Sequence, residues 1–352
     1  MLLTPLTIRD VTLRNRIVVS PMCQYSCDDG FATDWHLVHL GSRAVGGAGC
    51  VIAEATAVQP RGRISPHDLG IWKDEHVGAL ERVARFISQQ GAAPGIQIAH
   101  AGRKASVSVP WKGGHPVMGP DGGWIPVGPS PIPYSPGSPV PEELSLHEIA
   151  ETTASFKAAA LRALAAGFKV VELHFAHGYL VHEFLSPLSN ARTDKYGGAF
   201  ENRTRIAREI AQAVRGVWPE GLPLFARISC SDWAQGGWDI DESVTLARLL
   251  KTDGVDLVDC SGGGNIHGAG APAGPGYLTP YADRIRREAG ISTSTVGFIT
   301  SAQQADHILR NGQADLVVLA RQLLRDPYWP LHAAAELRVE TAWPNQYLRA
   351  KT

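Results

Sequence analysis

The sequence predicts a closed parallel (β/α)8 barrel formed by a single domain over residues 1–352. Short apolar runs of the kind that form buried strands alternate with helical patterns nearly from end to end. Glycines suited to helix C-termini follow several helical patterns, at Gly91, Gly167, Gly254 and Gly312. About eight β/α units without a break in composition favour this TIM-barrel architecture over an open sheet.

The expected elements follow one another in a regular order. Strands are expected at residues 16–22, 49–58, 94–100, 168–177, 222–230, 255–261, 294–299 and 314–319. Helices are expected between them, including residues 75–89, 145–166, 201–217, 243–252 and 302–311. A doubly wound sheet is the competing fold, but it would need a glycine-rich dinucleotide fingerprint after an early strand, and the sequence has none. The run Gly262–Gly264 lacks that spacing and is expected to be a loop.

Composition and charge exclude several functional classes. The chain is 44% hydrophobic and 19% charged, with a formal net charge of −1, which argues against electrostatic binding of nucleic acid. No apolar run approaches the roughly 18 residues that span a membrane. The first residues lack the features of an export signal, so a cytoplasmic location is expected. The five cysteines have neither the number nor the spacing of a disulfide framework or metal cluster.

A long irregular segment follows the third expected strand. Residues 104–141 are rich in proline, glycine and tryptophan. Loops of this length in a compact domain are usually lids or binding loops, so this segment is expected to cap the carboxyl-terminal mouth of the barrel over the substrate. A solubilising excursion is the alternative, although Trp111 and Trp124 would then need cover for their rings.

The fourth expected strand carries the most informative pattern. Alternation places its apolar side chains on one face, while Glu172 and His174 point to the other, which is unusual for a strand buried on both sides. His174 and His177 can line one pocket only if the strand ends near Ala176 and Gly178 lets the chain turn. Together with Tyr179 they would form a site for a polar oxygen and a proton donor.

Other polar residues are expected at the same mouth, because barrel active sites lie at the carboxyl ends of the strands. Gly297 and Arg321 follow strands seven and eight, where barrel enzymes commonly hold a phosphate. Gln97 and Arg227 lie deeper. This distribution suggests a phosphorylated cofactor. A metal held by the two histidines is disfavoured, because their loop has no third histidine or carboxylate at ligand spacing.

Several motifs together resemble the Old Yellow Enzyme family of flavin-dependent ene-reductases, in particular its bacterial thermophilic-like branch. The resemblance spans nearly the whole chain. It rests on residues 21–25, 54–57, 95–104, 174–198, 201–203 and 320–327, of which the His-x-x-His-Gly-Tyr block with Arg-Thr-Asp-Lys-Tyr-Gly-Gly is the most specific.

The resemblance implies non-covalently bound FMN, reduced by NADPH or NADH. The backbone from Ser20 through Cys23 and the residue Ala57 would contact the flavin ring, Gln97 would bind its pyrimidine, and Arg227 would lie near its N1 and C2 carbonyl. The full set of implied cofactor contacts is Ser20, Pro21, Met22, Cys23, Ala57, Gln97, His174, Arg227, Gly297, Ala320 and Arg321, of which the last three would hold the phosphate.

The resemblance also implies a reaction, in which activated C=C bonds of enones, enals, maleimides or nitro compounds accept a hydride from the flavin N5. His174 and His177 would bind the substrate oxygen, Tyr179 would protonate the adjacent carbon, Tyr25 would line the pocket, and Cys23 would tune the flavin potential. A metal- or phosphate-dependent barrel lyase or isomerase is the alternative enzyme, and a flavin-storing protein without turnover is an alternative of another class.

The C-terminal residues 340–352 resemble a tail that reaches the active site of a neighbouring subunit. Arg349 would then bind substrate in a homodimer or homotetramer. A frayed terminus is the alternative. The physiological substrate and the choice between NADPH and NADH stay open at this stage.

Overall fold

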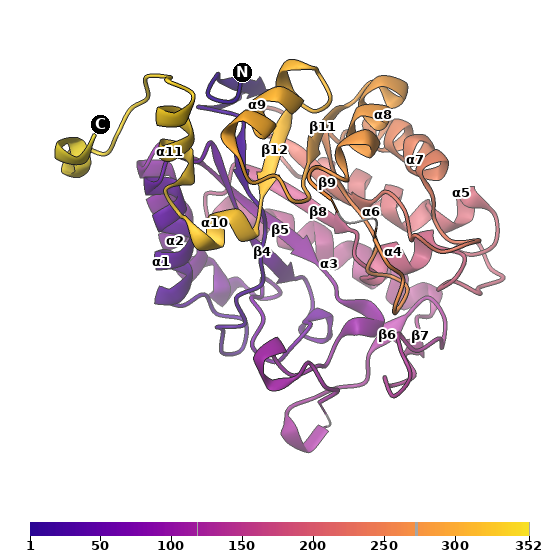
Figure 1. The fold of residues 1–352 in the computed structure, drawn as a ribbon. Coiled ribbons are helices and arrows are strands. Elements are labelled where there is room, and N and C mark those ends of the chain that lie inside the picture. The colour runs from indigo at the N-terminus through magenta and orange to yellow at the C-terminus, as the bar shows by residue number, and fades with distance from the viewer. Residues whose placement is uncertain (118, 272–273, 352) are drawn as a thin grey trace.

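The computed structural model, which describes residues 1–117, 119–271 and 274–351, forms a closed barrel of eight parallel strands (Figure 1). This confirms the predicted fold class. The barrel strands in chain order are β3 (Ile17–Val19), β4 (Cys50–Ala57), β5 (Ala93–Ala99), β8 (Val170–Phe175), β9 (Leu224–Ser229), β10 (Leu257–Ser261), β11 (Ser292–Thr295) and β12 (Leu316–Leu319).

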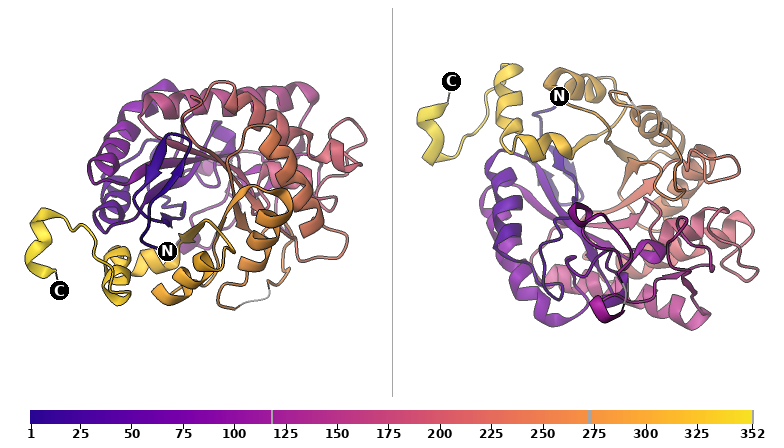
Figure 2. Two further views of the ribbon diagram at one scale, coloured as in Figure 1. Left: turned by 90° about the horizontal axis from the view of Figure 1, so that it is seen from above. Right: turned by 60° about the horizontal axis from the view of Figure 1, so that its bottom comes forward.

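Helices surround the barrel, and the five expected ones are present with small shifts in their ends (Figure 2). The longer helices are α1 (Asp34–Val45), α2 (Val77–Gln89), α3 (Leu146–Ala165), α6 (Arg205–Arg215), α7 (Ile240–Thr252), α8 (Thr279–Ala289), α9 (Ala302–Arg310) and α11 (Trp329–Glu336), and the short ones are α4 (Leu180–Leu185), α5 (Phe200–Arg203) and α10 (Arg321–Arg325).

Several expected elements begin or end at other residues, among them one helix and one strand. The helix expected at 201–217 is divided into α5 and α6 at Thr204. The strand expected at 294–299 starts and ends earlier, at Ser292 and Thr295, because Gly297 adopts a left-handed φ of 112° that ends the extended backbone.

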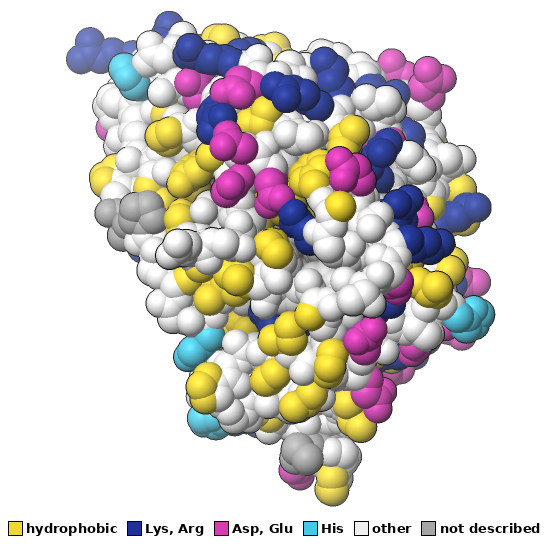
Figure 3. All heavy atoms as spheres, turned by 90° about the vertical axis from the view of Figure 1, so that its right-hand side faces the viewer, with side chains coloured by type: hydrophobic (Ala, Val, Ile, Leu, Met, Phe, Trp, Pro, Cys, Tyr) yellow, Lys and Arg dark blue, Asp and Glu magenta, His cyan; other side chains and the backbone are white. Residues whose placement is uncertain are grey.

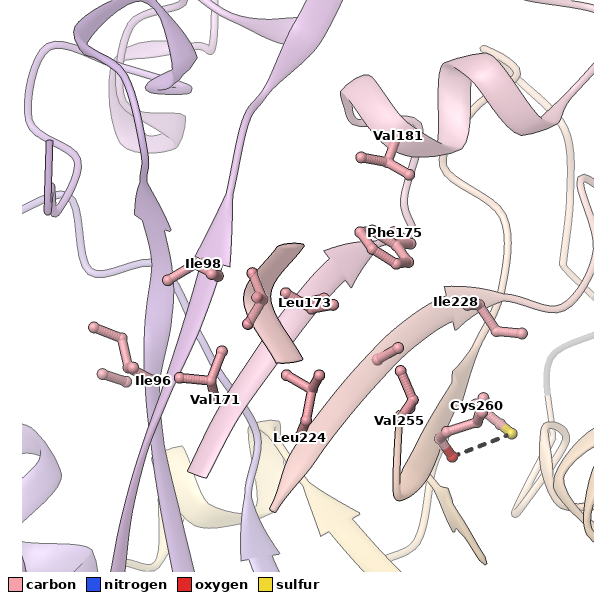
Figure 4. Close-up of a cluster of buried hydrophobic side chains, with 14 of the residues drawn as sticks. Ile96, Ile98, Val171, Leu173, Phe175, Val181, Leu224, Ile228, Val255 and Cys260 are labelled. Atoms are coloured by element: carbon pink, nitrogen blue, oxygen red, sulfur yellow. Dashed lines mark hydrogen bonds between the residues drawn. The ribbon is translucent and has the colours of Figure 1, made fainter. Parts of the chain in front are cut away.

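The alternation predicted for β8 is present. Val171, Leu173 and Phe175 are fully buried in the main apolar core together with side chains of β5 and β9, as Figure 4 shows. The intervening residues Glu172 and His174 face the barrel interior, where polar groups of neighbouring strands also lie. The strand therefore separates a packed outer face from a polar inner one.

A short hairpin fills the amino-terminal end of the barrel. Strands β1 (Leu6–Ile8) and β2 (Val11–Leu13) pair antiparallel, and Leu13 packs with Val18 and Phe225 in a second apolar cluster. Figure 2 (left) shows this hairpin lying across the barrel. Because apolar side chains of this hairpin cover the amino-terminal end, the polar end of the barrel is the carboxyl-terminal one.

The segment 104–141 lies against the opposite end (Figure 2, right). It includes β6 (Val127–Gly128), which pairs with β7 (Glu142–Glu143), and the residue Met118 within it lies outside the described part. Trp124 is partly covered and donates its indole N–H to the Arg61 carbonyl at 2.8 Å. The expectation of cover was wrong for Trp111, which is 68% exposed although its ring packs in a T-shaped pair with Tyr25.

The C-terminal tail projects away from the barrel and carries a short 3-10 turn over Asn345–Ala350 (Figures 1 and 2). Thr352 lies outside the described residues. Basic and acidic side chains are interspersed on the face in Figure 3, as the near-zero net charge predicts. Within the described ranges, none of the helices combines the length and the apolar character needed to cross a membrane.

Candidate active site

A tight turn after β8 gathers the three aromatic polar residues. The strand ends at Phe175, and both His177 and Gly178 then adopt left-handed backbone, with φ of 61° and 71°. The ring of His174 consequently lies 5.1 Å from that of His177 and 5.0 Å from that of Tyr179, edge to face in both pairs. The structure thus brings together the groups that the sequence placed at one mouth.

The glycine run after β10 makes room for this turn. A Cβ atom on Gly178 would lie 2.2 Å from the Gly264 carbonyl oxygen, and one on Gly264 would lie 2.7 Å from the His177 Cα. The two backbones can approach only because both residues lack a side chain. Lys104 joins them, since its ammonium donates to the His177 and Gly264 carbonyls at 2.8 and 2.9 Å.

Both histidines are neutral in this setting. Burial, followed by the charge of Arg227, holds the pKa of His174 and of His177 well below the ordinary value. The Ala176 N–H donates to His174 Nδ1 at 3.2 Å, so the ring proton of His174 is on Nε2. The Nε2 atom of His177 forms a 2.6 Å hydrogen bond with the Ser261 hydroxyl. Sequence reasoning missed Ser261, although it ends a strand at the same mouth.

Tyr179 lies in an apolar cluster that also contains Cys23, Tyr25 and Trp124. Burial, assisted by the proximity of Cys23, raises the pKa of Tyr179 well above its ordinary value, so the phenol keeps its proton. Burial likewise raises the pKa of the Cys23 thiol.

A cavity of about 600 Å³ opens between this cluster and segment 104–141. Tyr179 and Lys104 line its floor, and Tyr134 of the long segment lines its wall. The Lys104 ammonium lies 4.6 Å from the Tyr134 ring centre and 5.1 Å from that of Tyr179, and burial lowers its pKa to about 8. The cavity is large enough for a small organic substrate.

Polar residues of neighbouring strands meet inside the barrel. Gln97 donates to Glu172 at 2.7 Å. Arg227 donates to the Ser20 hydroxyl at 3.0 Å, and its Nε lies 3.3 Å from Asp259 Oδ2. Burial, and then the charge of Asp259, raises the pKa of Glu172. Asp259 was not identified from the sequence, and the unusual inward position of Glu172 was the available signal.

A second cavity lies at the ends of β11 and β12. Arg227 and Ser261 line its inner side, and Gly297, Ala320 and Arg321 line its outer side. Gly297 presents bare backbone, because a Cβ atom there would lie 2.7 Å from the Tyr277 ring.

Arg321 contributes an available positive charge to this cavity. Its guanidinium lies 4.7 Å from the Phe298 ring centre, and within the described residues it has neither an ion pair nor a hydrogen bond.

The remaining predicted residues vary in their access to these cavities. Ser20 is buried, whereas Pro21 and Met22 are half-buried at the end of β3. The backbone N–H of Ala57 already donates to the Leu69 carbonyl at 2.8 Å, so its methyl group is the part free for a contact. Arg349 is on the exposed tail, and its own chain does not bring it to the site.

Comparison with known proteins places the chain in a family. A model described as the NADH:flavin oxidoreductase / NADH oxidase family matches residues 1–340. The chain belongs to this family. It is therefore an oxidoreductase, and the resemblance to Old Yellow Enzyme is confirmed.

Members and structural neighbours of the family match nearly the whole chain. NADPH dehydrogenase of Geobacillus sp. (strain WCH70) is 51% identical over 351 residues, covering 99% of this chain and 98% of that protein. NADPH dehydrogenase of Bacillus subtilis (strain 168) is 48% identical over 350 residues, with the same coverage. Morphinone reductase has a TM-score of 0.80 at 26% identity, covering 98% of this chain and 91% of its own.

The residues of this family member suit FMN. The second cavity offers backbone at Gly297 and the unpaired Arg321 to a phosphate. The buried Oε2 of Glu172 lacks a hydrogen-bond partner within the described residues, as expected beneath a polar ring system. The second cavity therefore extends from a phosphate-binding end at Gly297 and Arg321 to the polar interior of the barrel, where Arg227 and Ser261 line it.

Proposed function

We propose that this chain is an FMN-dependent NAD(P)H oxidoreductase that reduces activated C=C bonds of enones, enals, maleimides or nitro compounds. The observation that carries this proposal is the pair of neutral imidazoles, His174 and His177, beside the protonated phenol of Tyr179. Family membership supports the cofactor, and the curated NADPH dehydrogenases support the reductant.

Residues on or after seven of the barrel strands would hold FMN. Gly297, Ala320 and Arg321 bind its phosphate, and Gln97 and Arg227 bind its ring from the barrel interior. The loop Ser20–Cys23, Ala57 and His174 contact the ring from the sides. When bound, FMN accepts two electrons from NAD(P)H and passes them to the electron-poor carbon of the second substrate.

The histidines polarise the substrate. The Nε2–H of His174 donates a hydrogen bond to the carbonyl or nitro oxygen. His177 donates a second hydrogen bond to the same oxygen, in place of its contact with Ser261. Negative charge that develops on this oxygen is met by donors that are already in place, so little reorganisation is needed. Two neutral donors also avoid the cost of burying imidazolium ions.

Tyr179 supplies the proton. Its phenol is protonated at neutral pH and lies beside His174, so the carbon next to the activating group can receive its proton. Tyr25 lines the pocket, and Cys23 lies in the same cluster and tunes the flavin potential. The chain is a single barrel domain. Its segment 104–141 caps the bound substrate and excludes water from the active site.

The assembly and location belong to the same proposal. A small molecule is the substrate, and the enzyme acts in the cytoplasm. The projecting tail over residues 340–352 reaches a neighbouring subunit in a homodimer or homotetramer, where Arg349 contacts the bound substrate.

The decisive experiment combines a spectrum with an assay. The purified chain should carry the visible absorption of FMN, and 2-cyclohexenone should accelerate its oxidation of NADPH. His177→Ala should weaken binding of a phenolic ligand while FMN stays bound. Absence of flavin absorption after reconstitution with FMN contradicts the cofactor assignment, and absence of enone-dependent NADPH oxidation contradicts the activity.

A further inference from the structure

A buried histidine–aspartate pair lies directly behind the turn that carries His177 and Tyr179. His182 on α4 and Asp232, in the loop after β9, are both 0% exposed. The Gly178 N–H donates to His182 Nδ1 at 2.9 Å. On the other side of the ring, His182 Nε2 lies 3.0 Å from Asp232 Oδ1. A single imidazole therefore bridges the turn and a carboxylate that lies 50 or more residues away in the chain.

The hydrogen bonds specify where the His182 proton lies. Because Gly178 donates to Nδ1, that atom carries a lone pair and the proton is on Nε2, facing Asp232. Asp232 is itself fixed, since its Oδ2 accepts from the Ser186 hydroxyl at 2.5 Å and from the Trp238 N–H at 2.9 Å. Burial acts to raise the pKa of Asp232, but the adjacent His182 imidazole and the hydrogen bond from Ser186 hold it below the ordinary value. The charged carboxylate thus selects the tautomer that the turn requires.

The turn needs this support because its backbone is strained. Two successive residues have positive φ, and one of them, His177, is not glycine. Two polar backbone groups of the strained residue have side-chain partners: the His177 N–H donates to the Ser229 hydroxyl at 2.9 Å, and the His177 carbonyl accepts from Lys104. His182 provides the acceptor for Gly178, whose N–H would otherwise be buried without one.

We propose that His182, oriented by Asp232, is a positioning residue that holds the Gly178 turn and thereby sets the position of His177 relative to Tyr179, which lines the substrate cavity. It touches neither substrate nor cofactor and acts through the backbone. The inference rests on the proposed function in one respect, that the oxygen bound by His174 and His177 belongs to the substrate. The placement of His182 between Gly178 and Asp232 does not depend on which molecule the site binds.

Two substitutions separate the two sides of the ring. His182→Asn keeps an acceptor near the position of Nδ1 but does not reach Asp232, whereas His182→Gln keeps a donor near Nε2 and loses the acceptor for Gly178. The FMN-loaded enzymes are titrated with 4-hydroxybenzaldehyde, and binding is followed by visible absorbance. We expect His182→Asn to bind within about threefold of the wild type and His182→Gln to bind about tenfold more weakly, with FMN content unchanged. Equal affinities of the two variants, or the reverse order, overturn the proposal.

A direct measurement on the turn keeps the test independent of folding yield. Amide exchange of a peptide spanning residues 176–185 should be faster in His182→Gln than in His182→Asn. Ser186→Ala, which loosens Asp232 without changing His182, should weaken ligand binding about threefold. If amide exchange is unchanged in His182→Gln and ligand binding is unchanged in both His182→Gln and Ser186→Ala, the positioning role of His182 is overturned.

A matched control removes a buried imidazole elsewhere. His39 on α1 is buried, its pKa lies at about 3 because of burial, and it is far along the chain from the turn. His39→Asn should leave ligand binding unchanged, and an equal loss there would overturn the proposal by showing a general effect of losing a buried histidine. A wild type that neither binds the phenol nor reduces 2-cyclohexenone contradicts the proposed function, whereas a wild type that does both while His182→Gln matches it contradicts only this inference.

Discussion

The β8 end and the β12 end of the site are built in opposite ways. At the β8 end, side chains bond to the His177 N–H, the His177 carbonyl and the Gly178 N–H of the strained turn, and the rings of His174 and Tyr179 pack edge to face. At the β12 end, Arg321 is exposed and unpaired within the described residues, and Gly297 presents bare backbone.

The difference indicates what each end does. Groups that stabilise charge in a transition state work best when they are fixed before the reaction, and the β8 end has that character. A phosphate brings its own charge and can order a free guanidinium when it binds. We therefore expect substitutions at the β8 end to change turnover or folding and substitutions at the β12 end to change cofactor affinity.

The largest effect is expected for Tyr179→Phe. Loss of the phenolic proton should slow reduction of 2-cyclohexenone by the pre-reduced enzyme about a thousandfold, because a general acid contributes about 10²–10⁴-fold. FMN content and phenol binding should be retained, and stopped-flow absorbance measures the rate. Tyr196→Phe is the control, because that hydroxyl bonds to Glu209 instead. A rate for Tyr179→Phe within about threefold of the wild type would assign the proton to another group.

The next effect tests the close approach of the turn to the glycine run. Gly178→Ala places a Cβ atom 2.2 Å from the Gly264 carbonyl, at a φ of 71°, and should lower the free energy of unfolding by about 3 kcal/mol or more. Gly236→Ala has nearly the same φ, 74°, with nothing within 4 Å, and should cost about 1 kcal/mol. Urea unfolding measures both, and equal costs would show that the approach is not tight.

The β12 end should respond in cofactor affinity. Arg321→Ala removes the unpaired cation and should raise the dissociation constant of FMN about 10- to 100-fold. Riboflavin has no phosphate, so its affinity should stay within about threefold. Fluorescence titration of the apoenzyme measures both ligands. A parallel loss for riboflavin would place Arg321 at the ring rather than at the phosphate.

A pH dependence is also expected at the β8 end. Burial raises the pKa of Glu183 to about 8, against the opposing charge of Arg103. A raised folded-state pKa adds stability below the unfolded value of 4.5, and this stability is lost as the pH rises towards 8. Relative to Glu183→Gln, the wild type should lose about 1.4 kcal/mol of unfolding free energy per pH unit in that window. A constant difference between pH 5 and pH 8 would contradict the raised pKa.

Much of the fold follows from local patterns in the chain. Apolar runs and helix-ending glycines predict the barrel because each depends on neighbours within one element. His174, His177 and Tyr179 could be placed at one mouth because they are close in sequence and Gly178 stands between them.

The partners of these residues could not be predicted, because they depend on the register between strands. Ser261 meets His177 across 84 positions, and Glu172 meets Gln97 across 75. His182 looks like any helix residue until Asp232 is placed beside it. The left-handed φ of His177 was equally hidden, since it results from the surrounding contacts rather than from the residue type.

The hairpin at the amino-terminal end has a kinetic consequence. Leu13 and its neighbours fill that end of the barrel, so NADPH and the enone must both arrive through the carboxyl-terminal mouth. If both occupy the space beside His174 and Tyr179, the oxidised nucleotide has to leave before the second reactant enters. Double-reciprocal plots of the initial rate against enone concentration, at several fixed NADPH concentrations, should then give parallel lines. A large excess of either reactant should inhibit the reaction by blocking entry of the other.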